Sequence, residues 1–157
     1  MANETPYSQL PALAGTHLGE SAWHEIDQDR VNLFADATGD HQWIHVDPER
    51  AAAGPFGGPI AHGYLTLSLA PVLLEEILIV ADAAQIVNYG LGKVRFPAPV
   101  PVGARLRLSA DCLSVEEVTG GYQVALALTF ELEGQPKPAC VAEILFRYYG
   151  AAATQAT

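Results

Sequence analysis

The feature that most constrains the fold is one long apolar segment, IAHGYLTLSLAPVLLEEILIV, at residues 60–80. Its length approaches that of a membrane span, but His62, Pro71, Glu75 and Glu76 interrupt it. We therefore expect a buried helix in the core of a water-soluble protein. A helix that is apolar nearly all round must be covered on several sides.

The hydrophobic period then changes from helical to two, which is typical of half-buried strands. Leu106, Leu108, Ala110 and Cys112 alternate with polar residues and should share one face. Five strands are expected: Ser21–Ile26, Gln85–Phe96, Arg105–Leu113, Tyr122–Leu132 and Ala139–Tyr149. A curved antiparallel sheet wrapped around the apolar helix would bury both, so the sequence predicts an α+β fold. We expect one domain over residues 1–157, with its core at about 20–149.

Two pairs of residues mark helix ends before the apolar segment. Asp27 is expected to cap the start of a helix that Gly39 ends. Asp47 followed by Pro48 is the signature of a second, shorter helix start.

The composition excludes several classes of function. The formal net charge is -10, whereas general nucleic-acid or membrane-surface binding requires a basic surface. Cys112 and Cys140 lie in expected strands without a CxxC motif, so we expect reduced core thiols. Residues 1–15 lack the basic start and apolar run of a signal peptide, and we expect a cytoplasmic protein. Residues 150–157 are expected to fray.

The polar run DHQWIHVD, which begins at Asp40, could bind a metal ion through its acids and histidines. His41 and His45 have the spacing of a helical pair, but the flanking glycine and proline argue against a helix. Asp47 already serves as a helix cap, and no HEXXH motif is present. We therefore expect no metal.

The same run could instead supply an acid/base pair. Asp40 and His45 lie about 140° apart on a helix and on opposite faces of a strand. They converge only if residues 41–44 form an irregular loop, and could then hold a water and move its protons. The alternative is a turn acid beside a hydrogen-bonded core histidine, and on residue types alone this is the simpler reading. Nucleophilic catalysis has less support because no G-x-S-x-G motif is present.

A second candidate lies at the start of the apolar helix, in GGPIAHGYL. Gly63 has no side chain, so a ligand carbonyl could approach its backbone N–H closely. The alternative is that Gly63 only permits tight packing. His62 could face a ligand or be a hydrogen-bonded core histidine.

Residues 34–69, FADATGDHQWIHVDPERAAAGPFGGPIAHGYLTLSL, closely resemble the MaoC-like dehydratase family, which includes R-specific enoyl-CoA hydratases and NodN-like proteins. The shared pattern is T-G-D, then Q, then H, then D-P, and later I-x-H-G-x-L. Residues 93–108, KVRFPAPVPVGARLRL, resemble the family's R-F-x-x-P-V-x-x-G segment. The resemblance extends over most of residues 20–149.

This resemblance implies a hot-dog fold and a homodimer, with sheets joined edge to edge and active sites near the interface. It implies that Asp40 and His45 bind the reacting water and that the Gly63 N–H polarises a thioester carbonyl. Gln42 stands at an orienting position, where the best-known hydratases have asparagine. The implied reaction is reversible syn addition of water to a trans-2-enoyl-CoA, without metal or other cofactor.

The expected substrate-binding residues are Ala61, His62, Lys93 and Arg95. Lys93 and Arg95 belong, with Arg105 and Arg107, to a basic cluster that could receive the phosphates of coenzyme A. The alternative is a set of solvated strand ends. The acyl chain should lie beside the helix, near one or more aromatic residues: Phe34, Trp43, Phe56 or Tyr64.

Two rival functions remain open. One is an acyl-CoA thioesterase of the same fold, against which the GD…H…HG pattern argues. The other is a non-catalytic acyl-CoA binder of the NodN-like kind. Chain length and physiological direction are not encoded in the motifs.

Overall fold

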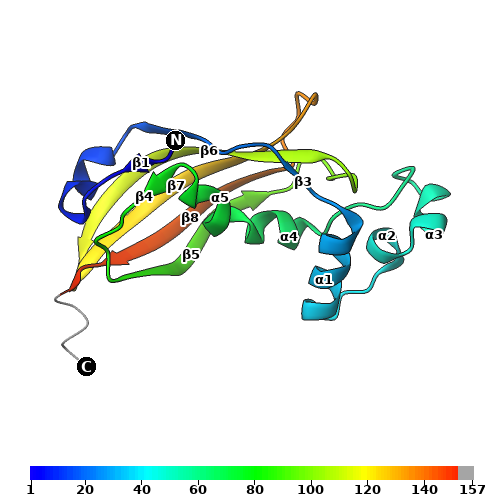
Figure 1. Cartoon of the computed structure of the whole chain (residues 1–157), viewed down its shortest axis with the longest axis horizontal. Helices are drawn as coiled ribbons and strands as arrows, with labels where there is room; N and C mark the ends of the chain where they lie inside the picture. Colours follow the sequence, from blue (N-terminus) through cyan, green and yellow to red (C-terminus); the bar gives the residue numbers. More distant parts are fainter. Residues whose placement is uncertain (152–157) are drawn as a thin grey trace.

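A six-stranded antiparallel sheet forms the body of the protein, for which a computed structural model describes residues 1–151 (Figure 1). The strand order is β2-β6-β7-β8-β5, and β3 also pairs with β6. The strands are β2 (His17–Glu20), β3 (His24–Glu25), β5 (Gln85–Arg95), β6 (Arg105–Val118), β7 (Gly121–Leu132) and β8 (Cys140–Tyr149). Two short strands, β1 (Asn3–Glu4) and β4 (Leu78–Ile79), form a separate parallel pair.

The period-two pattern of the sheet is confirmed. Leu108 on β6 lies opposite Phe130 on β7, and both are fully buried. The expected strand at 21–26 is only partly correct. The chain pairs with β6 in two pieces, β2 and β3, because residues 21–23 leave the ladder between them.

The apolar segment is helical over a shorter range than expected. It forms α4 (Gly63–Ser68) and α5 (Ala70–Glu75), not one helix over 60–80. Pro71 lies in the first turn of α5 and has no N–H to continue the ladder of α4. Leu65, Leu69 and Leu73 are buried in the core that the two helices share with the sheet. The sequence therefore predicted the burial correctly and the continuity wrongly.

Three helices precede this segment and lie together at one end of the molecule, beyond α4: α1 (Gln28–Thr38), α2 (Trp43–Val46) and α3 (Pro48–Ala52) (Figure 1). A 3₁₀ helix, η1 (Tyr7–Leu13), lies near the N-terminus. The expected caps are confirmed. The Asp27 carboxylate accepts the N–H of Arg30 at 2.8 Å, and Gly39 ends α1 at φ 81°. The Asp47 carboxylate accepts the N–H of Arg50 at 3.1 Å. Each side-chain cap contributes about 1 kcal/mol.

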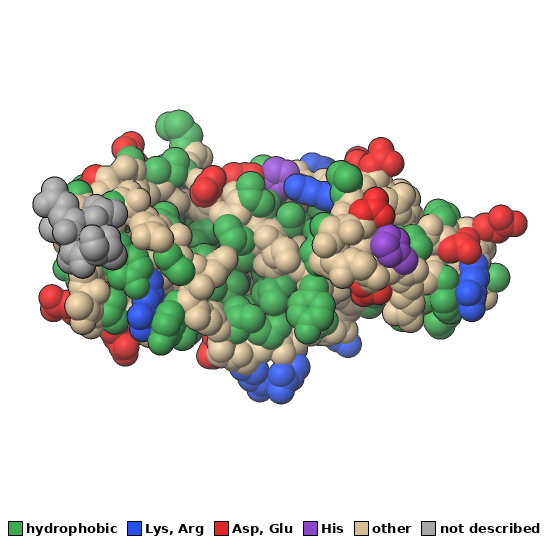
Figure 2. Space-filling view, turned by 90° about the horizontal axis from the view of Figure 1, so that it is seen from below, with side chains coloured by type: hydrophobic (Ala, Val, Ile, Leu, Met, Phe, Trp, Pro, Cys, Tyr) green, Lys and Arg blue, Asp and Glu red, His purple; other side chains and the backbone are tan. Residues whose placement is uncertain are grey.

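Strand β5 lies at one edge of the sheet and exposes large apolar side chains, among them Ile86, Tyr89 and Leu91. A groove of about 360 Å³ separates β5 from the helices, with Leu67 and Pro71 on its helical wall. Figure 2 shows hydrophobic side chains around a hollow on the side of the molecule where β5 lies in Figure 1.

Three expectations concern other parts of the chain. Cys112 and Cys140 are buried free thiols, as expected. Within residues 1–151, no helix is long and apolar enough to cross a membrane. The expectation of a frayed C-terminus concerns mainly residues 152–157, which lie outside the described residues.

Candidate active site

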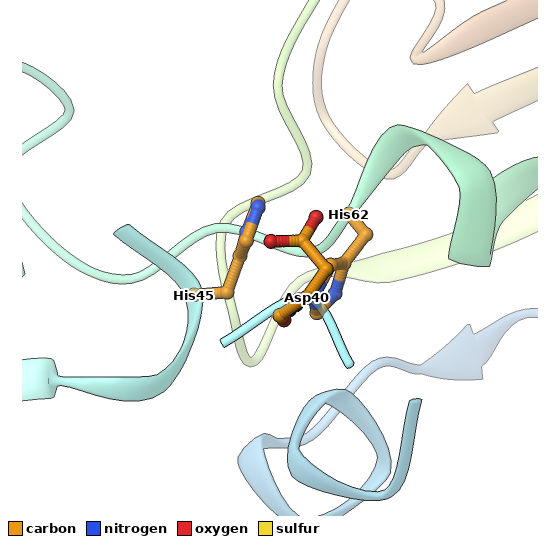
Figure 3. A group of neighbouring side chains, drawn as sticks. All are labelled: Asp40, His45 and His62. Carbon is orange, nitrogen blue, oxygen red and sulfur yellow. Dashed lines mark hydrogen bonds between the residues drawn. The ribbon is translucent and has the colours of Figure 1, made fainter. Parts of the chain in front are cut away.

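Asp40, His45 and His62 lie together although the first and the last are 22 positions apart in the chain (Figure 3). One possible ligand or proton-accepting atom of each lies within 4.8 Å of the others. The irregular loop expected at 41–44 is only partly correct, since Trp43–Val46 form the single helical turn α2. The Gln42 carbonyl accepts the N–H of His45 at 3.0 Å and closes this turn, which brings the His45 ring inward.

One hydrogen bond selects the tautomer of the neutral His45 ring. It is 6% exposed, and its Nδ1 donates to the Ile60 carbonyl at 2.7 Å, because a carbonyl can only accept. Its Nε2 therefore carries the free lone pair. Burial lowers the pKa of His45 from its ordinary value and the nearby His62 lowers it further, while the Ile60 bond and Asp40 oppose the shift. A neutral imidazole with a free Nε2 can accept a proton.

His62 is a core residue, one of the two alternatives that the sequence left open. It is 3% exposed, and its Nε2 donates to the backbone carbonyl of Asp40 at 3.0 Å. Its ring stacks on that of His45, with centroids 3.8 Å apart and planes 23° apart. The Phe34 ring also contacts the His62 ring, with centroids 4.9 Å apart and planes tilted by 55°.

The side chains of Asp40, His45 and His62 are the ligand types of a zinc site. A metal ion, however, must lie in the plane of each imidazole that binds it. Because the two rings are nearly parallel and stacked, their in-plane lone pairs do not meet at one nearby point. The geometry fits an acid/base pair with a supporting ring better than a metal centre.

A cavity of about 270 Å³ opens beside this cluster. His45, Ala61 and Gly63 line it, and the Ala61 N–H is already bonded to the Val100 carbonyl. In the part of the chain that is described, no acceptor is bonded to the Gly63 N–H. The Phe96 ring forms the wall beside Gly63. Asp40 is exposed and is not among the residues that line this cavity.

Gln42 has a different environment from the one expected of an orienting side chain. Its backbone N–H donates to the Asp40 carboxylate at 3.3 Å, and its backbone carbonyl holds α2. Its side-chain amide forms no hydrogen bond within residues 1–151. Gln42 thus contacts the pair through its backbone.

The expected basic cluster divides into two parts on non-adjacent strands. Arg105 and Arg107 on β6 are ion-paired with Glu133 and Glu131. Lys93 and Arg95, near the end of edge strand β5, have no ion-pair partner among the described residues. Lys93 and Arg95 lie three and one positions before Phe96 in the chain and are the better candidates to meet an anionic ligand.

Of the four aromatic residues expected near the acyl chain, only Phe56 lines the cavity. The sequence reasoning did not single out three residues of the site: Gln28, Thr66 and Phe96. Gln28 donates to the His45 carbonyl at 2.8 Å, a bond without any sequence signal. Thr66 follows Gly63 by three positions on a helix, and this spacing could have placed it on the cavity side.

Comparisons with known proteins identify the family and the fold. The family model "MaoC like domain" matches residues 9–131. The 3-hydroxyacyl-thioester dehydratase Z of Mycobacterium tuberculosis is 56% identical over 142 residues, covering 90% of this chain and 94% of the relative. Nodulation protein N of Rhizobium meliloti is 44% identical over 145 residues, covering 89% of each chain. The unliganded R-hydratase PhaJ1 of Pseudomonas aeruginosa superposes with a TM-score of 0.73 and 25% identity, covering 92% of this chain and 86% of that one.

The chain belongs to the MaoC-like dehydratase family. Its fold is the hot-dog fold expected from the sequence, with the central helix in two pieces. Membership places it among the hydro-lyases, the enzymes that add or remove water.

Proposed function

We propose that the protein catalyses reversible syn addition of water to a trans-2-enoyl-CoA, giving an (R)-3-hydroxyacyl-CoA. The observation that carries this proposal is the meeting of the Asp40 carboxylate with His45, whose neutral ring has its Nε2 free. The cavity beside them is lined by Gly63, whose N–H has no acceptor among residues 1–151. The names of the relatives, a thioester dehydratase and an R-hydratase, agree with the same reaction class.

In this mechanism a single water molecule donates one of its hydrogens to the Asp40 carboxylate and its second hydrogen to His45 Nε2. Its oxygen attacks C3 while one member of the pair takes a proton. The enolate charge that develops on the thioester oxygen is stabilised by the Gly63 N–H, and such preorganised donors are worth about 3–4 kcal/mol. A proton from the pair then reaches C2 on the same face, so the pair returns to its starting state.

The substrate should enter past Phe96, with its acyl chain toward the apolar cavity wall. We place the phosphates of coenzyme A near Lys93 and Arg95, which lack ion-pair partners in residues 1–151. The chemistry needs no metal or redox cofactor, because the charge that develops is met by a backbone donor. Two buried free thiols agree with a reducing compartment, and we propose the cytoplasm.

Crotonyl-CoA separates the three candidate functions. Loss of enoyl absorbance without release of free thiol supports hydration, and chiral analysis of the product should give the (R) isomer. Release of free coenzyme A would show a thioesterase instead. Saturable binding without turnover would show a non-catalytic binder.

We also propose that the protein is a homodimer joined through edge strand β5. An unpaired edge strand with exposed Ile86 and Leu91, beside an apolar groove, is a surface that a second copy can cover. Light scattering after size exclusion should give twice the chain mass. Leu91→Asp should shift the mass toward the monomer, whereas Leu113→Asp, at an exposed leucine on β6, should not. A monomeric wild-type protein would contradict this proposal.

A further inference from the structure

His62 contacts or adjoins each of the groups to which the reaction is assigned. Its Nε2 donates to the Asp40 carbonyl, its ring stacks on His45, and Gly63 is the next residue in the chain. His62 itself is not among the residues that line the cavity. These contacts could hold the reacting groups in place without any contact between His62 and substrate.

The second observation is a buried atom without a partner. His62 Nε2 donates its hydrogen to the Asp40 carbonyl, which leaves Nδ1 as the second polar atom of the ring, and Nδ1 is buried without a hydrogen bond among the described residues. A buried polar atom without a partner destabilises a fold, and the apolar ring of a phenylalanine would fill about the same space beside Phe34. A polar ring kept at such a position needs a reason other than packing.

We propose that His62 is a positioning residue that holds Asp40 and His45 in the geometry needed to clamp the reacting water. The inference rests on the proposed hydration reaction. The hydrogen bond sets the backbone of Asp40, and the stack sets the plane of the His45 ring, whose edge is already tied to Ile60. Displacements of about 1 Å in such a pair cost up to 100-fold in rate.

Two variants separate the two contacts. His62→Phe keeps a ring that can stack on His45 but removes the donor to the Asp40 carbonyl. His62→Gln can place an amide N–H near the position of Nε2 but removes the stack. Both should lower kcat for crotonyl-CoA at least about tenfold, with KM changed less than about threefold because His62 lies outside the cavity wall. His41→Gln is the control. His41 is an exposed histidine next to Asp40 in the chain, its ring pairs with Asp36, and the variant should keep wild-type kinetics.

A second readout does not depend on turnover. NMR titration of the His45 ring should give a higher pKa in both variants than in the wild type, because the neighbouring His62 helps to lower it.

If one variant does not fold, the other decides alone, since each removes one contact. Wild-type kcat in a folded variant, or a loss confined to KM, would overturn the proposal. If the wild type does not hydrate crotonyl-CoA, the proposed function fails. In that case the positioning role is judged by the NMR titration alone, and a His45 pKa that is the same in the His62 variants as in the wild type would overturn it.

Discussion

The Phe96 ring lies 3.2 Å from the position that a β-carbon on Gly63 would occupy. The backbone of Gly63 is helical and has no positive φ, so the constraint on this residue is contact and not conformation. Any side chain here would press on the wall of the cavity beside the N–H assigned to the thioester carbonyl.

Gly63→Ala should therefore lower kcat/KM for crotonyl-CoA at least about tenfold, which is less than the roughly 100-fold or greater loss when an oxyanion donor is removed, because the N–H stays in place and only the wall beside it is crowded. The fold should survive, because Phe96 is 45% exposed and can move, and alanine favours helices over glycine by up to about 1 kcal/mol. Steady-state kinetics and thermal melting check both parts.

Gly58→Ala is the matched control. Gly58 lies in the same connection, has no positive φ, and has open space where a β-carbon would point. It should keep wild-type kinetics. Equal losses in Gly63→Ala and Gly58→Ala would show that the connection as a whole, and not the Gly63 contact, limits the rate.

The pH dependence of the reaction should reflect the lowered pKa of His45. Its folded-state pKa lies below the ordinary value of about 6.5, and the neutral ring is the form that accepts a proton. Activity should be present above that folded pKa and be lost as pH falls through it. The acid limb of kcat/KM should therefore have its midpoint below about 6.5.

The pH dependence of folding stability reports the pKa of His45 less clearly than the pH dependence of kcat/KM does. The lowered pKa of His45 makes the folded state lose stability as pH falls below about 6.5. His17 and His41 have raised pKa values from their carboxylate partners, so their contributions are present at low pH and are lost as pH rises through their folded pKa. Because these contributions to stability change with pH in opposite directions over the same pH range, a melting curve does not isolate that of His45.

An acid limb of kcat/KM with its midpoint at or above about 6.5 would contradict the environment assigned to His45.

Much of the fold could be predicted because its signals are local. The caps at Asp27 and Asp47 need only the next three residues, and the alternation in β6 and β7 reflects burial of one face. The extent of the apolar helix could not be read in the same way. Its composition stays apolar to Val80, but Pro71 interrupts the hydrogen bonds and Leu78 pairs with β1, more than 70 residues earlier.

The site was predictable only in part. Asp40, His45 and Gly63 came from a motif, and the structure brings Asp40 and His45 together and places His45 and Gly63 on one cavity. The bond of His62 to the Asp40 carbonyl joins residues 22 apart through a backbone acceptor, which has no sequence signature. The ion pairs of Arg105 and Arg107 depend on strand register, so the sequence could not show that their charges are partly neutralised.

Charge removal should separate the two parts of the basic cluster. The double variant Lys93→Gln/Arg95→Gln should raise KM for crotonyl-CoA about tenfold, equivalent to ~1.4 kcal/mol. It should leave KM for crotonyl-pantetheine unchanged, because that substrate lacks the phosphates. Parallel kinetics on the two thioesters measure the difference.

Arg105→Gln is the control for this experiment, since its guanidinium is already paired with Glu133 at 3.0 Å. Its KM for crotonyl-CoA should stay within about twofold of wild type, as is usual for an exposed paired charge. A larger effect of Arg105→Gln than of the double variant would place the phosphates elsewhere.

Metal removal should leave the reaction intact. The stacked rings of His45 and His62 do not direct their lone pairs to one ion, and the proposed chemistry uses proton transfer alone. Dialysis against EDTA should leave the hydration rate unchanged. A loss that added Zn²⁺ restores would contradict the metal-free mechanism.

The most direct test of the account is the hydration rate of crotonyl-CoA in Asp40→Asn and His45→Gln, with the fold checked by circular dichroism. Each variant should lose at least about 100-fold in rate, as expected for paired acid/base groups, while its secondary structure stays unchanged. Near-wild-type hydration in either folded variant would contradict the proposed water clamp.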